Sequence, residues 1–202
     1  MQMNEMERSR TAGMDEVGRG ALAGPLVAAA VVLPDGLLPP PGIHLADSKS
    51  LLPLQRLAAA GWIQEHALQV EVESIGVQAI NTLGIGWANR VIFGRLMSKV
   101  RAARYLVDGN LRLHGLAPAG SVVLCICDGD ADEPAIAAAS IVAKVLRDNL
   151  MQSLHDDYPC YGWSHNAGYA TTEHRDAILS AGACLHHRTL FLRRLLDGGT
   201  IP

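Results

Sequence analysis

Short apolar segments rich in valine alternate along this chain with longer segments of helical spacing, and this alternation is the strongest constraint on its fold. The segment Leu26–Leu33 is almost entirely apolar, which is typical of a strand buried on both faces. The other expected strands are residues 11–16, Gln69–Ser74, Arg104–Val107 and Val122–Cys127. The expected helices between them are Leu54–His66, Ile85–Arg101 and Pro134–Leu154. This order of elements predicts an α/β fold.

The length and composition are those of one globular domain. The chain has 202 residues, of which 49% are hydrophobic and 18% charged, which excludes a disordered chain. Past Pro159 the sequence becomes richer in aromatic residues, glycine, histidine and arginine, with helices expected at Thr171–Ala181 and Arg188–Leu196. We therefore expect a single domain over residues 1–202, with a core of about residues 11–158 and a small C-terminal helical lobe of about 159–197.

Nothing in the sequence suggests a membrane span or an export signal. The weakly polar segment Gly20–Pro34 is interrupted by Gly24 and Pro25 and is shorter than the ~18–20 residues that cross a bilayer. The first ten residues carry four charges and no apolar run, unlike a secretory signal. The four cysteines lack the spacing of a zinc or redox motif, and we expect them to be small buried side chains. The sequence thus predicts a cytoplasmic protein.

Acidic residues follow three of the expected strands. Asp15 and Glu16 close the first strand, Asp108 follows Val107, and Asp130 comes shortly after Cys127. Residues beyond strand ends in an α/β sheet can converge on one crevice, where clustered carboxylates repel one another unless a hard cation neutralises them. Carboxylates without histidine or cysteine favour Mg²⁺ or Mn²⁺ and phosphoryl chemistry. The alternative is that each acid serves only a turn or a helix cap.

The glycines after the first strand allow a second interpretation. Residues 18–23 satisfy the G-x-G-x-x-A pattern of dinucleotide-binding proteins. That pattern must open a helix, whereas Gly24 and Pro25 are followed here by a strand-like run. The local context therefore argues against a dinucleotide-dependent oxidoreductase.

Residues Ala12–Val31 resemble the opening signature of the type 2 ribonuclease H family, and of bacterial ribonuclease HII in particular. The later family blocks resemble, in the same order, residues 47–49, 107–109, 129–130, 136–148, 168–169, 174 and 187–191. The resemblance covers about residues 11 to 191. It implies a ribonuclease H-like catalytic domain with a mixed sheet flanked by helices. It also implies a metal-dependent endonuclease that cuts the RNA strand of RNA–DNA hybrids and single ribonucleotides embedded in duplex DNA, leaving 5′-phosphate and 3′-hydroxyl ends.

The resemblance also assigns roles to individual residues. The catalytic, metal-binding carboxylates would be Asp15, Glu16, Asp108 and Asp130, holding two Mn²⁺ or Mg²⁺ ions. Neighbouring residues of a regular strand point to opposite faces, so we expect Glu16 to lie beyond the strand. Among the substrate-binding residues, Gly18, Arg19 and Gly20 would contact the ribonucleotide, and Tyr169 would pack on the adjoining deoxyribose. The phosphate backbone of the nucleic acid would be contacted by Lys49, Ser140, Lys144 and Arg188. The partner would be nucleic acid, and the protein a monomer.

Two acids depart from the family pattern. Asp128 stands where relatives usually have lysine, and Asp132 replaces a second basic position. Asp128 lies two residues from Asp130 and could compete for metal or face solvent. An alternative function is therefore a hybrid-binding protein of the same fold with weakened catalysis.

Overall fold

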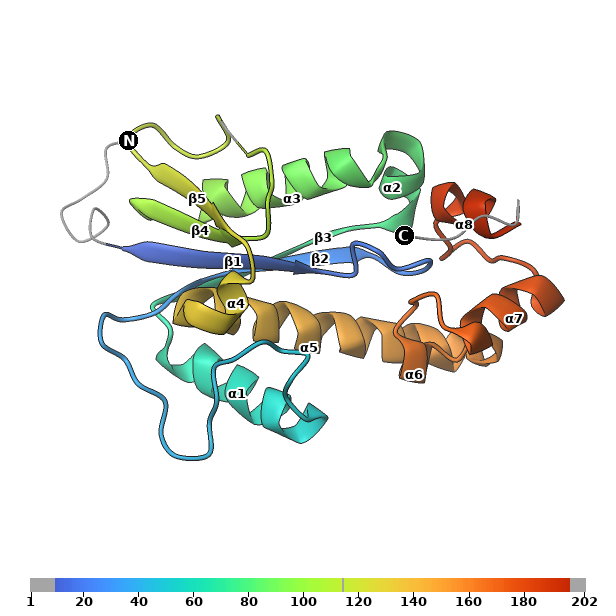
Figure 1. Ribbon diagram of the computed structural model, residues 1–202, viewed down its shortest axis with the longest axis horizontal. Helices are drawn as coiled ribbons and strands as arrows, with labels where there is room; N and C mark the ends of the chain where they lie inside the picture. The colour runs from blue at the N-terminus through green and yellow to red at the C-terminus, as the bar shows by residue number, and fades with distance from the viewer. Residues whose placement is uncertain (1–9, 114, 197–202) are drawn as a thin grey trace. The chain divides into compact units, whose positions relative to one another are not determined.

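A computed structural model describes residues 10–113 and 115–196 of the chain (Figure 1). Its centre is a mixed sheet of five strands in the order β3-β2-β1-β4-β5. The strands are β1 (Thr11–Val17), β2 (Leu26–Val32), β3 (Gln69–Ile75), β4 (Arg104–Asp108) and β5 (Val122–Ile126). The helices are α1 (Pro53–His66), α2 (Val77–Leu83), α3 (Ile85–Lys99), α4 (Gly129–Asp132), α5 (Pro134–Asp157), α6 (Trp163–Asn166), α7 (Thr172–Ala181) and α8 (Thr189–Leu196), with a 3₁₀ turn at Pro159–Tyr161. The predicted α/β fold is confirmed.

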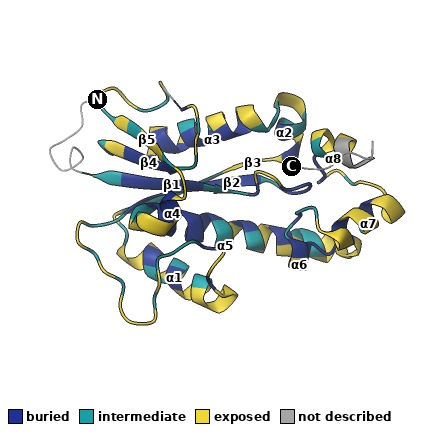
Figure 2. Ribbon diagram, in the orientation of Figure 1, coloured by how far each residue is buried: buried dark blue, intermediate teal, exposed yellow. Residues whose placement is uncertain are grey.

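The central strands are buried because their sequences are apolar on both faces (Figure 2). Every residue of β2 is buried. β1 pairs in parallel with β4 from Thr11↔Arg104 to Met14↔Val107, and β4 pairs in parallel with β5 up to Asp108↔Ile126. A Cβ on Gly13 would overlap the backbone of Ala135, so this glycine allows α5 to pack closely on β1. The parallel register brings the carboxyl ends of β1, β4 and β5 to one edge of the sheet.

The chain forms two compact units. Of the described residues, the first contains 10–17, 28–73, 90–113 and 115–145, and the second contains 18–27, 74–89 and 146–196. Within the first unit, α3 covers one face of the sheet, and α1 and the start of α5 cover the other (Figure 1). The second unit has its own core of Leu22, Ala23, Met151, Tyr161, Trp163, Ile178 and Leu192. The predicted division into a core and a lobe after residue 158 stays a prediction.

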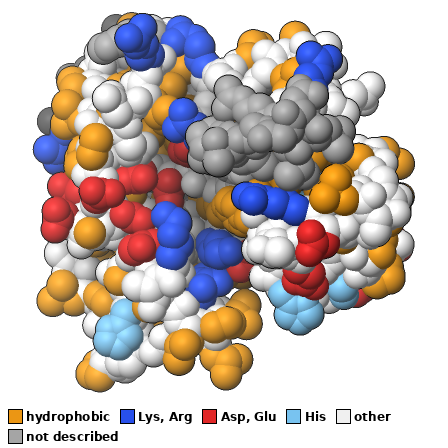
Figure 3. Space-filling model, turned by 45° about the vertical axis from the view of Figure 1, so that its right-hand side comes forward, with side chains coloured by type: hydrophobic (Ala, Val, Ile, Leu, Met, Phe, Trp, Pro, Cys, Tyr) orange, Lys and Arg blue, Asp and Glu red, His pale blue; other side chains and the backbone are white. Residues whose placement is uncertain are grey.

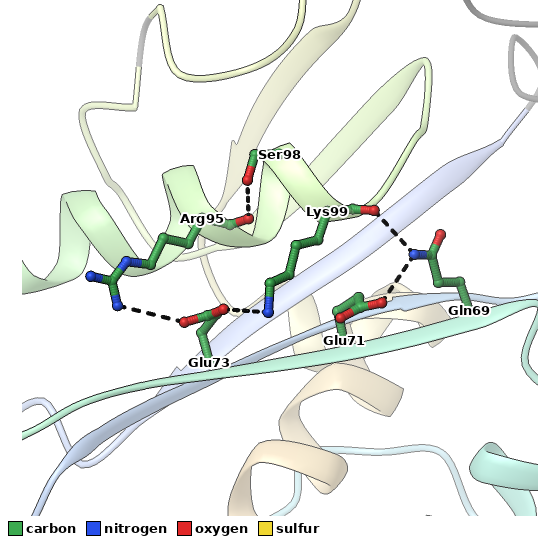
Figure 4. Close-up of polar contacts among 6 residues, drawn as sticks. All are labelled: Gln69, Glu71, Glu73, Arg95, Ser98 and Lys99. Carbon is green, nitrogen blue, oxygen red and sulfur yellow. Dashed lines mark hydrogen bonds and ion pairs between the residues drawn. The ribbon is translucent and has the colours of Figure 1, made fainter.

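Polar contacts fasten the end of α3 to β3 (Figure 4). Glu73 on β3 pairs with Lys99 at 2.6 Å and with Arg95 at 3.7 Å. The Gln69 side chain donates to the Lys99 carbonyl, 3.2 Å away. These contacts lie at the rim of the sheet, where ion pairs contribute little to stability, so the apolar side chains of α3 do most to hold this helix.

Two smaller expectations are wrong. Cys125, Cys127 and Cys160 are exposed, because β5 is an edge strand and the 3₁₀ turn lies at the surface. Glu16 does not leave the strand, since β1 continues to Val17, although the pairing of β1 with β4 ends at Met14. Among the described residues, no helix has both the length and the apolar character needed to cross a membrane.

Candidate active site

The four predicted carboxylates lie at the shared edge of the parallel strands. Asp15 and Glu16 are near the end of β1, Asp108 is the last residue of β4, and Asp130 lies in α4 just after β5. The charges of Glu16 and Asp108 act on Asp15, and that of Asp108 acts on Asp130. The structure therefore brings these four acids together. Figure 3 shows a broad group of acidic side chains at the left of the visible face and a smaller group at the right.

Asp15 is a buried member of this carboxylate cluster with a raised pKa. It is only 8% exposed. Burial, followed by the charges of Glu16 and Asp108, raises its pKa to about 7, against the opposing effect of a hydrogen bond from Ser140. At neutral pH this carboxyl group is therefore about half protonated unless a cation compensates its charge.

A relay of two buried hydroxyls orients Asp15. The Ser140 side chain on α5 hydrogen-bonds to the Asp15 carboxyl, and its Oγ lies 2.9 Å from Ser48 Oγ. A hydroxyl has one proton to donate, so when Ser140 donates to the carboxylate, Ser48 must be the donor to Ser140. Ser48 and Ser140 are each 3% exposed, so this relay is fixed inside the protein.

Asp47 is a fifth acid of this cluster, and the sequence analysis did not assign it. Burial first, and then the charges of Asp108 and Asp47, raise the pKa of Asp130, while Lys49 lowers it. Asp47 also hydrogen-bonds to Asp130, which requires a proton between the two carboxyl groups. The sequence signal for Asp47 is the family block Asp47-Ser48-Lys49, in which the resemblance assigns a role only to the lysine.

The turn that carries Asp47 and Lys49 is firmly held. Asp47 Oδ1 accepts the Lys49 N–H at 3.0 Å. Arg56, at the start of α1, donates through Nε to the Ser48 carbonyl at 2.9 Å and through Nη2 to the Leu51 carbonyl at 2.9 Å. Partial burial lowers the pKa of Lys49, but the nearby charges of Asp47, Asp130, Asp15 and Asp108 outweigh it, so the net effect is upward. The Lys49 ammonium is therefore a cation placed among carboxylates.

The carboxylate cluster has the donor chemistry that suits a hard divalent cation. Its ligand atoms are carboxylate oxygens, and the pKa values of Asp15 and Asp130 are raised by burial first and then by neighbouring carboxylates. In the described ranges, no group of three or more acidic, histidine or cysteine side chains converges on one point as the side chains stand. Asp108 Oδ1, for example, accepts the Gly129 N–H at 2.9 Å.

The predicted ribonucleotide-contacting residues lie in the second unit. Arg19 and Gly20 are exposed, whereas Gly18 is buried with a φ of +86°. The Gly18 N–H donates to the Tyr169 hydroxyl at 3.1 Å, so the structure brings these two predicted residues together. The guanidinium of Arg147 lies over the Tyr169 ring, 5.4 Å from its centre. Tyr169 is half-buried, and these contacts with Gly18 and Arg147 hold its ring in place.

The other predicted contacts differ in their exposure. Lys49 is exposed and Lys144 half-buried. Ser140 is buried and engaged with Ser48. Arg188 is fully buried and its guanidinium donates to backbone carbonyls. A direct phosphate contact by Ser140 or Arg188 stays a prediction, and this geometry gives it no support.

The two acids that depart from the family pattern are both exposed. Asp128 adopts a left-handed backbone conformation, with a φ of +54°, directly before α4. Its carbonyl accepts the Ala131 N–H at 3.1 Å. Its backbone therefore shapes the turn that positions Asp130.

Comparisons with known proteins agree with this geometry. The family model for Ribonuclease HII matches residues 12–194. A ribonuclease HII of Synechococcus sp. (strain JA-3-3Ab) is 44% identical over 191 residues, covering 94% of this chain and 85% of the relative. The solved ribonuclease H2 of Pyrococcus horikoshii OT3 has a TM-score of 0.79 at 21% identity, covering 94% of this chain and 98% of that one.

A second solved structure, Bst-RNase HIII in complex with Mn²⁺, has a TM-score of 0.65 at 18% identity, covering 97% of this chain and 72% of that one. At these identities the two structures show a shared fold. The family model and the curated relative show more, because they match most of the chain in sequence. The chain belongs to the ribonuclease HII family and is an endonuclease that hydrolyses phosphodiester bonds.

Proposed function

We propose that this enzyme cuts the RNA strand of RNA–DNA hybrids and cuts at single ribonucleotides embedded in duplex DNA, leaving 5′-phosphate and 3′-hydroxyl ends. The observation that carries this proposal is the carboxylate cluster, in which Asp15 is buried yet has a pKa of about 7. A buried group of like charges is unfavourable by itself and is typical of a site that receives a cation together with a phosphate. We further propose that the enzyme acts as a cytoplasmic monomer.

Asp15, Glu16, Asp108 and Asp130 would hold two divalent ions, Mn²⁺ or Mg²⁺. The Mn²⁺ complex of the fold relative Bst-RNase HIII supports this choice of ion. Such ions, when bound, lower the pKa of water and stabilise negative charge on a phosphodiester and its leaving oxygen. No covalent link between protein and substrate is then needed.

The protein's own residues prepare this site. The relay from Ser48 through Ser140 fixes the Asp15 carboxyl, and the Gly129 N–H fixes that of Asp108. Lys49 offsets part of the negative charge of the cluster. Because its side chain is exposed, Lys49 can also contact a phosphate of the nucleic acid.

Discrimination of RNA from DNA requires contact with the 2′-hydroxyl. We assign this contact to residues 18–20, where Arg19 and Gly20 are exposed and a Cβ on Gly20 would meet open space. Tyr169, joined to Gly18 by a hydrogen bond, would pack on the next deoxyribose. Lys144 would contact the phosphate backbone.

The test is cleavage of an end-labelled DNA duplex that contains one ribonucleotide. With Mn²⁺ or Mg²⁺ we expect a single cut on the 5′ side of the ribonucleotide, with a 5′-phosphate on the downstream product. An all-DNA duplex should stay intact. Tight, metal-insensitive binding without any product would overturn the proposal and favour the hybrid-binding alternative, in which Asp128 and Asp132 weaken catalysis.

A further inference from the structure

Two fully buried arginines lie beneath the segment Gly18–Pro25. Arg147, on α5, and Arg188, just before α8, are each 0% exposed. Within the described residues, all the hydrogen bonds of the Arg188 guanidinium go to backbone carbonyls of this segment. Buried cations are rare, so two that both bond to one loop point to a requirement on the shape of that loop.

Arg188 ties the two ends of the loop together. Its Nη1 donates to the Gly18 carbonyl at 2.6 Å and to the Arg19 carbonyl at 3.0 Å. Its Nε and Nη2 both donate to the Gly24 carbonyl, at 3.0 and 2.8 Å. The Arg188 backbone N–H adds a bond to the Leu22 carbonyl at 2.7 Å. One residue thus fixes the position of four peptide groups.

Arg147 supports the same segment from a second direction. It donates to the carbonyls of Ala23 at 3.1 Å, Pro25 at 3.0 Å and Ala167 at 2.8 Å. A Cβ on Gly18 would overlap its side chain. Arg147 therefore packs against the loop as well as bonding to it.

The carbonyl directions determine the directions of the N–H groups. In a trans peptide, the C=O of one residue and the N–H of the next point in opposite directions. The described residues contain no cis peptide. Since the Gly18 and Arg19 carbonyls point at the buried Arg188, the N–H groups of Arg19 and Gly20 point away from it. Both residues are exposed, so these two donors face outward side by side.

We propose that Arg188 is a positioning residue for sugar recognition: by holding the carbonyls of Gly18 and Arg19, it aims the N–H groups of Arg19 and Gly20 at the 2′-oxygen of a ribose. This inference rests on the proposed function. It moves Arg188 from the set of direct substrate contacts to a role beneath the loop. Lysine cannot replace arginine here, because a single ammonium cannot reach carbonyls on both ends of the loop in the fixed fork of a guanidinium.

The experiment compares Arg188→Lys with Arg193→Lys, which changes an exposed arginine of α8, the helix that begins directly after Arg188. For each protein, kcat/KM is measured on two duplexes that differ only in bearing a ribonucleotide or its 2′-fluoro analogue, a poor hydrogen-bond acceptor. We expect Arg188→Lys to lower the preference for the 2′-hydroxyl roughly tenfold, and Arg193→Lys to leave it unchanged. A purely structural role would slow both duplexes equally, and that result overturns the inference.

Two further measurements cover the remaining outcomes. If Arg188→Lys does not fold, as judged by thermal melting, Gly20→Pro removes one of the two donors at an exposed position and should lower the same preference. If the wild-type enzyme cleaves neither duplex, the proposed function has failed. The inference is then decided by binding of the ribonucleotide and all-DNA duplexes in fluorescence anisotropy: it stands if Arg188→Lys loses a preference that the wild type shows, and falls otherwise.

Discussion

The first unit buries Asp15 and Asp130 among other carboxylates, whereas the second buries Arg147 and Arg188 among backbone carbonyls. In the second unit the buried charge is matched by the protein itself, since the described hydrogen bonds of both guanidiniums end on carbonyl oxygens. In the carboxylate cluster, burial first and then the like charges of Glu16 and Asp108 raise the pKa of Asp15 to about 7. Buried charges that are fully hydrogen-bonded within the protein, like these arginines, stabilise its structure. Buried like charges without a compensating cation, like these carboxylates, indicate a ligand-binding site.

The largest expected effect comes from Asp15→Asn, which should lower cleavage by more than roughly 10³-fold, because a proposed metal ligand and its charge are lost. The same change should stabilise the metal-free protein at pH 8. The folded-state pKa of about 7 lies above the ordinary value of 3.8, so the wild-type protein loses stability as pH rises from about 4 through 7. Melting in a chelator at pH 5 and pH 8 measures this. Asp157→Asn, an exposed acid at the end of α5, is the control. If Asp15→Asn melted at a lower temperature than the wild type at pH 8, the buried carboxylate of Asp15 would not be destabilising, contrary to the comparison drawn above.

Arg188→Met should have the opposite effect on stability. It removes a cation but leaves the carbonyls of Gly18, Arg19 and Gly24 without their buried donor. We expect the free energy of unfolding to fall by about 3 kcal/mol or more, measured by urea denaturation. Arg193→Met should change it little, because that side chain is exposed. If Arg188→Met were as stable as the wild type, the hydrogen bonds of Arg188 to the loop would not stabilise the protein.

Ser48→Ala should separate positioning from charge within the carboxylate cluster. It removes the donor to Ser140 and leaves every carboxylate in place. We expect kcat to fall by about tenfold, the loss typical of groups that orient a metal ligand, with little change in KM. Ser153→Ala, at an exposed position of α5, serves as the matched control. An unchanged kcat would mean that Asp15 is oriented without the relay.

The smallest effect concerns the buried histidines of the second unit. Trp163 Nε1 donates to His174 Nε2 at 3.0 Å, and the Cys184 N–H donates to His187 Nδ1 at 3.0 Å, so neither nitrogen can take up a proton without a clash of donors. Burial, and then the charge of His174, lowers the pKa of His187 to about 4. Since this value lies below the ordinary 6.5, stability should decline by about 1 kcal/mol as pH falls from 7 to 5.

His187→Asn should weaken this acid sensitivity, whereas His165→Gln, at an exposed position, should preserve it. Each histidine change is made in the Asp15→Asn protein, and urea denaturation is measured at pH 7 and pH 5. This background removes the titration of Asp15, which would raise stability as pH falls and so mask the effect of the histidines. Equal acid sensitivity of the two histidine variants would show that other groups control stability in this range.

The fold and the carboxylate cluster could be predicted from the sequence because both depend on local patterns. Apolar runs such as Leu26–Val32 mark buried strands, and an acid directly after a strand is carried to the sheet edge by the parallel register of β1, β4 and β5. The roles of Asp47 and Arg188 could not be predicted in this way. Asp47 meets Asp130 only through folding of a turn far away in sequence, and sequence does not reveal that the Arg188 side chain points inward.

The glycine at position 18 has a consequence for the interpretation of mutants. Any side chain there would collide with Arg147 and would have to adopt a φ of +86°, so an inactive Gly18→Ala enzyme would report damage to the loop's construction. At Gly20, where an added methyl group meets nothing, a loss of activity would instead report interference with the nucleic acid. On the function proposed above, the two glycines of this short motif thus divide between building the protein and touching its substrate.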